Sequence, residues 1–271
     1  MHSPVGPIGL IALLGFGFVH GRAAAPIDAL VFTPDSRAVV YQHAGSLRVH
    51  VIDGPPGADI PCDLPKITDA DFSPDSRWLA VTGGLPGSSG NLRIYDWPTG
   101  KLIAARNEQA DTATALAWHP AMDSLAVASA DRTVLIIGLA DGKLQSEPRA
   151  RLTDHSRPVL DLAYSPDGKT IVTGSADRSL KVWDSTTGKL LRSLGNHTEI
   201  VHCLAMRPPV VFDGRPLPAY CASAGDDRTV RIWQPGIGRM VRIVRYHEAP
   251  VFTLAWHPAG DRLFSAGQEG I

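Results

Sequence analysis

Cysteine is scarce in this sequence, and the three residues present are Cys62, Cys203 and Cys221. Three cysteines so far apart cannot build a disulfide framework, and the absence of a Cys-x-x-Cys pair argues against a zinc site. A bridge between Cys203 and Cys221 is an alternative, but the repeat described below places them on opposite faces, and disulfide geometry is demanding. We therefore expect three small buried side chains.

An excess of basic charge is also lacking, since 26 lysines and arginines nearly cancel 27 acidic residues and leave a net charge of −1. Nucleic-acid-binding domains usually carry a basic footprint. Hydrophobic residues make up 44% and charged residues 20%, which is the balance of a globular protein rather than of a disordered one. The composition therefore predicts a globular chain with no nucleic-acid partner.

Established catalytic and cofactor-binding motifs are missing as well, since there is no GxxxxGKS/T, HExxH or GxSxG pattern and no GxGxxG that opens a helix. His155, Thr173 and Asp177 match a catalytic triad by residue type, but the same kinds of residue recur in the next unit, which indicates a structural role. Likewise His155, His197 and His247 recur once per unit and are expected to lie far apart. We predict no catalytic, cofactor-binding or metal-binding residues, and a chain that is not an enzyme.

The N-terminus carries an apolar run at residues 7–19, PIGLIALLGFGFV, followed by HGRAAA at 20–25. This run is short for a bilayer span, but it fits the hydrophobic region of a secretory signal with small residues at the cleavage site. We therefore predict a signal peptide over residues 1–25, an exported mature protein (periplasmic or extracellular), and membrane contact only through that transient segment. Because no lysine or arginine precedes the run, an uncleaved strand on a cytoplasmic protein is the alternative.

A phrase of the type Leu-Ala-Tyr-Ser-Pro-Asp-Gly occurs six times along the chain. Its anchors recur every 40 to 50 residues, and they are Phe32, Phe72, Trp118, Tyr164, Met206 and Trp256. A second phrase, such as GSADRSLKVWD at 174–184, follows in each complete unit and alternates polar with apolar residues, as half-buried strands do. The two phrases therefore predict that each unit forms short antiparallel strands joined by Pro-Asp-Gly and Asp-Arg turns. The whole chain is predicted to be all-β.

Repeated four-stranded units of this length are typical of a β-propeller with one sheet per blade. With these phrases the chain resembles the WD40-repeat family over residues 26–271. The resemblance implies a WD40-type propeller of four-stranded antiparallel blades, five of them complete and a sixth present as its first half. The sixth unit stops before its third strand, so we expect a domain that is incomplete at its C-terminus and truncated from seven blades. A six-bladed ring closed by residues 10–25 is the alternative.

The resemblance also implies a hydrogen-bonded tetrad in each well-formed blade, made of a His, a Ser or Thr, an Asp and a Trp. A buried Asp is costly unless its oxygens find donors, so such a set gives the Asp a structural purpose. In the fourth and fifth units the structural tetrads are His155, Thr173, Asp177 and Trp183, and His197, Ser223, Asp227 and Trp233. The earlier units depart from the pattern and are expected to depend more on apolar packing.

As a function, the resemblance implies a non-catalytic scaffold that mediates protein–protein or protein–peptide interactions. Partners of such propellers sit on the face around the central channel, and the positions on that face are His202, Asp226, Phe252 and Gln268. The partner is predicted to be a protein or a peptide, and no cofactor is expected. The alternatives are the propeller portion of a larger enzyme or kinase-linked protein, and an incomplete fragment with no independent function.

Overall fold

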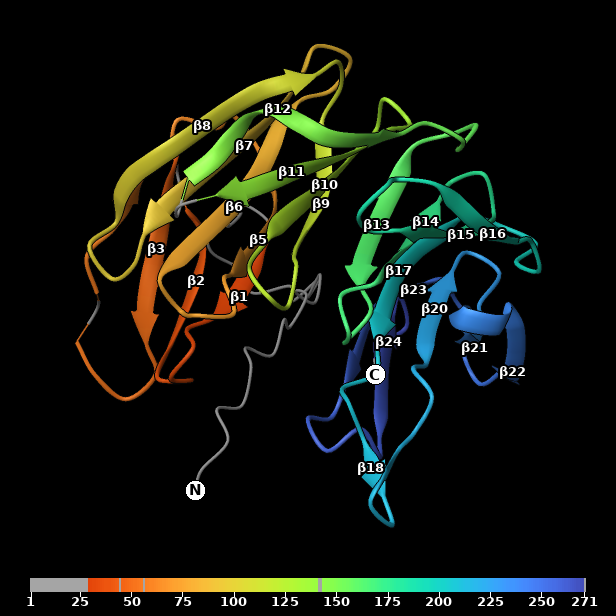
Figure 1. The fold of residues 1–271 in the computed structure, drawn as a ribbon. Helices are drawn as coiled ribbons and strands as arrows, with labels where there is room; N and C mark the ends of the chain where they lie inside the picture. The colour runs from red at the N-terminus through yellow and green to blue at the C-terminus, as the bar shows by residue number, and fades with distance from the viewer. Residues whose placement is uncertain (1–28, 44, 56, 141–142, 271) are drawn as a thin grey trace.

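The structure, a computed structural model, describes residues 29–43, 45–55, 57–140 and 143–270. Its regular elements are almost all β-strands, and they form successive antiparallel sheets that follow one another around an arc (Figure 1). Each main sheet is called a blade and is numbered in chain order.

Blade 1 consists of β1 (Leu30–Phe32), β2 (Ala38–His43), β3 (Ser46–Val51) and β4 (Ile60–Pro61). Blade 2 consists of β5 (Ile67–Phe72), β6 (Trp78–Leu85), β7 (Ser89–Asp96) and β8 (Lys101–Gln109). Blade 3 consists of β9 (Ala113–Trp118), β10 (Ser124–Ser129), β11 (Val134–Ala140) and β12 (Lys143–Leu152).

Blade 4 consists of β13 (Val159–Tyr164), β14 (Thr170–Ser175), β15 (Leu180–Asp184) and β16 (Leu190–Leu194). Blade 5 consists of β17 (Val201–Met206), β20 (Cys221–Gly225), β21 (Val230–Gln234) and β22 (Arg239–Val244), with one 3-10 turn at Pro235–Ile237. Blade 6 has two strands, β23 (Val251–Trp256) and β24 (Leu263–Gly267). The described residues therefore confirm the predicted fold class, with five complete blades and the first half of a sixth.

The turn that follows each inner strand is built by its own sequence. In blade 2, Ser73 Oγ donates to Asp75 Oδ1 at 2.6 Å, and the same carboxylate accepts the backbone N–H of Arg77. The residue that follows this Asp needs a positive φ, which is 62° at Ser76 in blade 2 and 72° at Gly168 in blade 4. Asp and Gly tolerate these turn conformations, which is why the Pro-Asp-Gly phrase recurs at this point.

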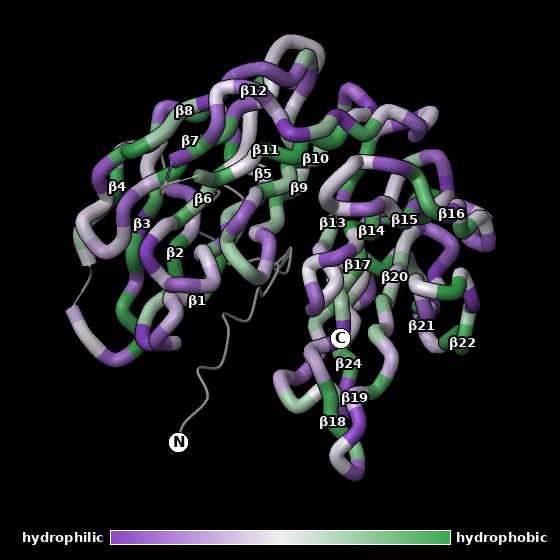
Figure 2. The backbone as a smooth tube through the Cα atoms, viewed as in Figure 1, coloured by the Kyte–Doolittle hydropathy of each residue, from purple (hydrophilic) through white to green (hydrophobic). Residues whose placement is uncertain are grey.

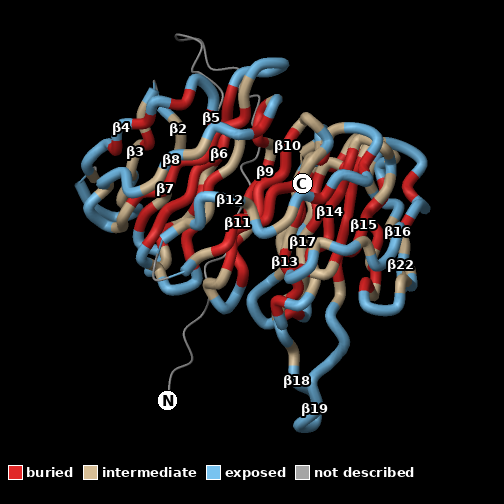
Figure 3. The backbone as a smooth tube through the Cα atoms, turned by 45° about the horizontal axis from the view of Figure 1, so that its top comes forward, coloured by how far each residue is buried: buried red, intermediate tan, exposed pale blue. Residues whose placement is uncertain are grey.

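The core is a series of apolar layers between neighbouring blades rather than one central mass. One layer joins Phe72 and Leu79 of blade 2 to Val31 and Val40 of blade 1, and another joins Val182 of blade 4 to blade 5. Hydrophobic residues concentrate along the strands, while the turns are mostly hydrophilic (Figure 2). The buried strand interiors lie between exposed turns (Figure 3). Each blade therefore depends on its neighbours for its burial.

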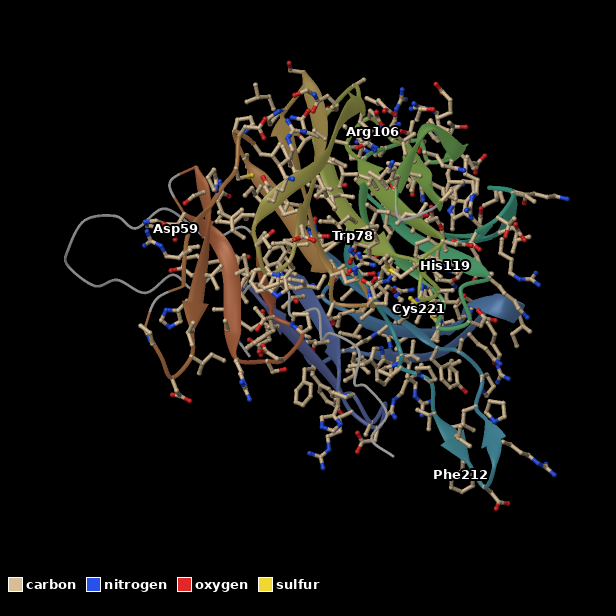
Figure 4. The ribbon with its side chains drawn as sticks, turned by 60° about the vertical axis from the view of Figure 1, so that its left-hand side comes forward. Asp59, Trp78, Arg106, His119, Phe212 and Cys221 are labelled. Carbon is tan, nitrogen blue, oxygen red and sulfur yellow. The ribbon has the colours of Figure 1, made fainter. Side chains whose placement is uncertain are left out.

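The cysteines are buried and free, as the spacing predicted. In blade 5 the pairing of β17 with β20 sets Cys221 opposite Met206 and Cys203 opposite Ala224, so the two thiols are not cross-strand partners. Figure 4 shows Cys221 inside the fold.

An insertion at residues 208–220 forms a separate hairpin of β18 (Val211–Phe212) and β19 (Arg215–Pro216). The hairpin protrudes from blade 5 (Figure 3), with Phe212 near its tip and 72% exposed (Figure 4). The predicted signal peptide, residues 1–25, and the alternative closing strand, residues 10–25, lie outside the described residues. Within the described ranges, no helix has the length and apolar character that a membrane crossing requires.

Candidate functional site

Blade 4 brings together the four residues of its predicted tetrad. His155 precedes β13, and its Nδ1 lies 2.7 Å from Asp177 Oδ2 while its Nε2 lies 2.7 Å from Thr173 Oγ1. The indole N–H of Trp183 donates to Thr173 Oγ1 at 2.9 Å. Asp177 also accepts the backbone N–H of Ser156 at 3.1 Å. The result is a continuous hydrogen-bonded chain that joins strands β14 and β15, the turn between them and the loop before β13, and we call it a histidine network.

Blade 5 has a second histidine network with the same geometry. His197 lies 2.7 Å from both Asp227 Oδ2 and Ser223 Oγ, and Trp233 Nε1 donates to Ser223 Oγ at 2.8 Å. Arg231 adds a bond to Asp227 Oδ2 at 3.1 Å. Hydrogen bonds from His197 and Thr229 outweigh desolvation and hold the pKa of the Asp227 carboxyl well below its usual range.

These networks do not offer a reactive nucleophile. Thr173 and Ser223 are fully buried, and each hydroxyl is already engaged by a histidine and an indole. A catalytic hydroxyl must reach a substrate, and neither of these can. The structure also contains no group of three or more His, Cys, Asp or Glu side chains placed to hold a metal ion, as far as its described ranges extend.

The equivalent positions of blades 2 and 3 are filled differently, in a way that the sequence reasoning missed. In blade 2 the histidine position is Asp63, whose carboxylate takes a two-point ion pair from buried Arg93 at 2.7 and 2.9 Å. In blade 3, Gln109 donates to the carbonyl of Val127 at 3.1 Å. An Asp at the histidine position and an Arg two residues before Tyr95 were the available signals for this ion pair.

The first strands of the blades, β1, β5, β9, β13, β17 and β23, line a cavity of about 450 Å³. Two aspartates of this lining join one blade to the next. Asp69 Oδ2 accepts the N–H of Leu116 at 2.9 Å, and Asp161 Oδ2 accepts the N–H of Leu204 at 2.7 Å. Burial raises the pKa of Asp69 to about 6 and that of Asp161 to about 8.

Other side chains make bonds between the same inner strands. Thr114 Oγ1 of blade 3 donates to the carbonyl of Val159 in blade 4 at 2.6 Å. The indole of Trp118 donates to the carbonyl of Asp71 in blade 2, and that of Trp256 to the carbonyl of Ala205 in blade 5, both at 3.2 Å. Every one of these bonds crosses from one blade to the adjacent one.

The stability of the folded chain is expected to fall as the pH rises from about 5 to about 9, because Asp161 is held neutral in the fold. An unfolded aspartate has a pKa of about 4, so unfolding releases a proton in this window. The contribution of this group is complete below pH 4 and is lost as the pH passes its folded value of about 8.

Urea denaturation at about pH 5, 7 and 9 measures this dependence. Asp161→Asn is expected to reduce this slope by its own share, because burial raises the pKa of Asp71 to about 8 as well, whereas Asp53→Asn, at an exposed position, keeps the slope of the original chain. Parallel pH profiles for the original chain and Asp161→Asn would contradict the assignment.

A second cavity of about 150 Å³ opens at the other end of the inner strands. It is lined by one equivalent position from each of blades 2 to 6, which are Thr68, Thr114, Leu160, His202 and Phe252. The two threonines turn their hydroxyls to the next blade and are thereby occupied. Leu160 is half-buried, and His202 and Phe252 are the two aromatic side chains of this set.

His202, Asp226 and Phe252 meet at this opening, and we call them the mouth site. His202 Nε2 lies 2.6 Å from Asp226 Oδ1, and the rings of His202 and Phe252 have centroids 5.0 Å apart. Phe252 is 37% exposed. Gln268, the fourth predicted position, is exposed on the turn after β24, where its N–H donates to the carbonyl of Pro250.

The mouth site differs from the histidine networks in its exposure. The His202 and Asp226 side chains are 25% and 33% exposed, against 0% and 3% for His197 and Asp227. A buried pair is needed by the fold, but a partly exposed polar pair beside an exposed aromatic ring is typical of a recognition surface.

Comparison with known families shows repeats of one kind. The profile of the family described as WD domain, G-beta repeat, matches residues 61–96, 146–184, 188–234 and 238–271. These segments contain both histidine networks and all three residues of the mouth site.

Among curated proteins, the chain is 34% identical over 137 residues to COMPASS component SWD3 of Saccharomyces cerevisiae, which is 50% of this chain and 40% of the relative. It is 28% identical over 190 residues to Protein HIR1 of Eremothecium gossypii, covering 59% of this chain and 22% of the relative. It is 34% identical over 86 residues to WD repeat and SOCS box-containing protein 1 of Xenopus tropicalis, covering 29% and 20%. The chain thus spans less than half the length of these relatives.

Proposed function

Because this chain belongs to the WD40-repeat family, we propose that it is a non-catalytic scaffold that binds a protein or peptide partner at the mouth site. The carrying observation is the partly exposed His202–Asp226 pair against the Phe252 ring, at the opening of the smaller cavity. One relative is by its name a component of a larger assembly, which supports a partner that is itself a protein.

The mouth site offers complementary kinds of contact within a small area. The Phe252 ring provides apolar area and a π face, while the second oxygen of Asp226 can accept a hydrogen bond from a partner donor. The three residues come from β17, from the turn after β20 and from β23, so two adjacent blades hold them. A pre-organised surface lowers the ordering cost of binding, which is the mechanism proposed for this scaffold.

A site-specific photo-crosslinker tests the proposal. Placed at Phe252, it is expected to capture a defined protein from an extract of the source cells, while the same group at Val241 is not. Val241 is a matched control because it is 46% exposed but lies on the outer strand β22.

Once the captured partner is purified, its affinity for variants of the chain measures how much each side chain of the mouth site contributes to binding. Phe252→Ala is expected to weaken it roughly tenfold or more, as loss of an interface hot spot does. Asp226→Ala is expected to weaken it as well, while Val241→Ala leaves it unchanged. Equal capture from both crosslinker positions, or unchanged affinity in Phe252→Ala, would contradict binding at the mouth site.

A further inference from the structure

The hairpin of β18 and β19 exposes apolar side chains at one point of the surface. Val211 and Phe212 are 66% and 72% exposed, and Leu217, just after β19, is 38% exposed. The hairpin forms its own two-stranded sheet between β17 and β20, so it is not part of the sheet of blade 5. It follows the end of β17 that is farther from His202 and therefore lies away from the mouth site. Apolar groups gathered on an exposed insertion are typical of an interaction surface.

The hairpin is braced at its turn and at its base. Its turn residues, Asp213 and Gly214, have φ values of 49° and 71°, the positive values that a tight two-residue hairpin turn needs. At the base, the N–H of Arg207 donates to the carbonyl of Tyr220 at 2.8 Å, and the Arg207 guanidinium lies 5.4 Å from the centre of the Tyr220 ring. Four prolines between positions 208 and 218 restrict the backbone further. The hairpin therefore presents its side chains in fixed positions, which lowers the ordering cost of binding.

The two faces of the hairpin carry different side chains. Val211 lies opposite Pro216, and Phe212 lies opposite Arg215. Because successive side chains of a strand point to opposite faces, the first pair lies on one face and the second pair on the other. Accordingly, Val211 and Pro216 line a pocket, whereas Phe212 and Arg215 lie outside its lining and are exposed (Figure 4 labels Phe212). We call Phe212 and Arg215 the hairpin knob.

The pocket on the other face of the hairpin has a volume of about 300 Å³. It is lined by Val211 and Pro216 of the hairpin and by Pro166 and Asp167, in the turn after the first strand of blade 4. Since a cavity of about 150 Å³ is enough to hold benzene, a phenyl ring fits this pocket. Asp167 is exposed, and the hydrogen bonds that it accepts within its own turn go to Oδ1, so its Oδ2 can accept a further donor.

The hairpin knob and this pocket are complementary in shape and in charge. Phe212 offers an apolar ring, and the pocket offers proline and valine walls. Arg215 lies directly across the hairpin from Phe212, and Asp167 lies at the pocket, so a cation accompanies the ring toward a carboxylate. Because the knob and the pocket are on opposite faces of one braced hairpin, a chain cannot fill its own pocket with its own knob. A second copy of the chain can.

From these observations we infer that the hairpin joins two copies of this chain. Phe212 of each copy enters the pocket of the other, and Arg215 meets Asp167 of the other copy. A two-fold axis beside the hairpins lets both pockets be filled at once, which closes the assembly at a dimer. The mouth site lies at the other end of the inner strands and stays accessible, so this contact is independent of the partner proposed above.

Analytical ultracentrifugation of the full chain over a series of concentrations measures this association. A monomer–dimer equilibrium is expected. Phe212→Ala is expected to weaken dimerisation roughly a hundredfold, because about tenfold is lost at each of the two equivalent contacts. Leu85→Ala is the matched control, since Leu85 is 49% exposed but lies on β6 in blade 2, and it is expected to leave the equilibrium unchanged.

Charge reversal distinguishes this contact from any other self-association. Arg215→Asp and Asp167→Arg each place like charges at both contacts of a homodimer, so each variant alone is expected to be monomeric. In a mixture of the two variants, the new carboxylate of one meets the new guanidinium of the other, while the unchanged Arg215 and Asp167 pair at the second contact. The mixture is therefore expected to form a heterodimer about as readily as the original chain forms its dimer.

Three results would overturn the inference. A chain that stays monomeric at every concentration would show that no second copy occupies the pocket, so that another molecule or other residues of the chain cover the knob. Association unchanged by Phe212→Ala would place the contact elsewhere on the chain. Folded charge-reversal variants that stay monomeric when mixed would show that Arg215 and Asp167 do not meet. Circular dichroism checks the fold of each variant, and Phe212→Ala keeps the test valid even if Asp167→Arg disturbs its turn, because Phe212 lies outside the blades.

Discussion

Trp233→Ala is expected to lower the free energy of unfolding by about 3–5 kcal/mol, the range for removing a large buried aromatic side chain. Trp233 is 1% exposed and packs in the apolar layer between blades 4 and 5, against Val182 and Leu204. Its indole N–H also satisfies Ser223, so the substitution both opens a cavity and leaves a buried hydroxyl with one partner fewer.

Chemical denaturation monitored by circular dichroism measures this change. Ile237→Ala is the control, because Ile237 is 59% exposed in the short 3-10 turn. This substitution is expected to lower the free energy of unfolding by less than about 0.5 kcal/mol. Trp233→Phe, which keeps much of the ring volume but not the donor, is expected to lie between the two. A Trp233→Ala variant as stable as Ile237→Ala would show that the layer between these blades is not needed for folding.

Asp227→Ala is expected to cost about 3–5 kcal/mol, because removing one partner of a buried charge pair leaves the other without compensation. The Asp227 side chain is 3% exposed. Its carboxylate is hydrogen-bonded to the His197 ring, to the Arg231 guanidinium and to the backbone N–H of Thr198. Since the pKa of Asp227 is depressed in the fold, its stabilisation is present above the unfolded pKa of about 4 and is lost as the pH falls further.

Blade 3 provides a matched control for the histidine and arginine contributions. Asp131 occupies the equivalent turn and accepts the N–H groups of Ala110 and Thr133, but Gln109 stands where His197 stands in blade 5. Asp131→Ala is therefore expected to cost only about 1 kcal/mol, the value of ordinary hydrogen bonds. Equal losses for Asp131→Ala and Asp227→Ala in urea denaturation would mean that the histidine network adds nothing to the turn itself.

Local chemistry explains why so much of this fold can be predicted from sequence. The strands alternate with period two and their turns carry Asp, Pro and Gly at fixed positions, so strand order and pairing follow from residues close together in the chain. The residues of the histidine networks could be located for the same reason. Ser223, Asp227 and Trp233 keep the spacing of Thr173, Asp177 and Trp183, and each histidine stands at the same position before the first strand of its blade.

The remaining contacts depend on how blades meet, which one sequence does not encode locally. The pairing of Asp63 with Arg93 joins the loop before β5 to strand β7, and the two residues are 30 positions apart in the chain. The bond from Leu204 to Asp161 requires two inner strands at the correct separation, a property of blade packing rather than of either strand. Likewise, the mouth site was visible as separate positions, but the contact of His202 with Phe252 emerges only from adjacent blades.

The hydrogen bonds between inner strands have a consequence for how a disturbance spreads through the molecule. The side-chain bonds of Asp69, Thr114, Asp161 and Trp256 each reach an adjacent blade, and the apolar layers do the same. The energetics are therefore those of a one-dimensional array, in which each unit is coupled to its nearest neighbours. Damage to one blade weakens the two beside it first and decays along the series, so blades on opposite sides of the channel respond almost independently. A binding event at blades 5 and 6 is accordingly coupled strongly to blade 4, which is packed against blade 5.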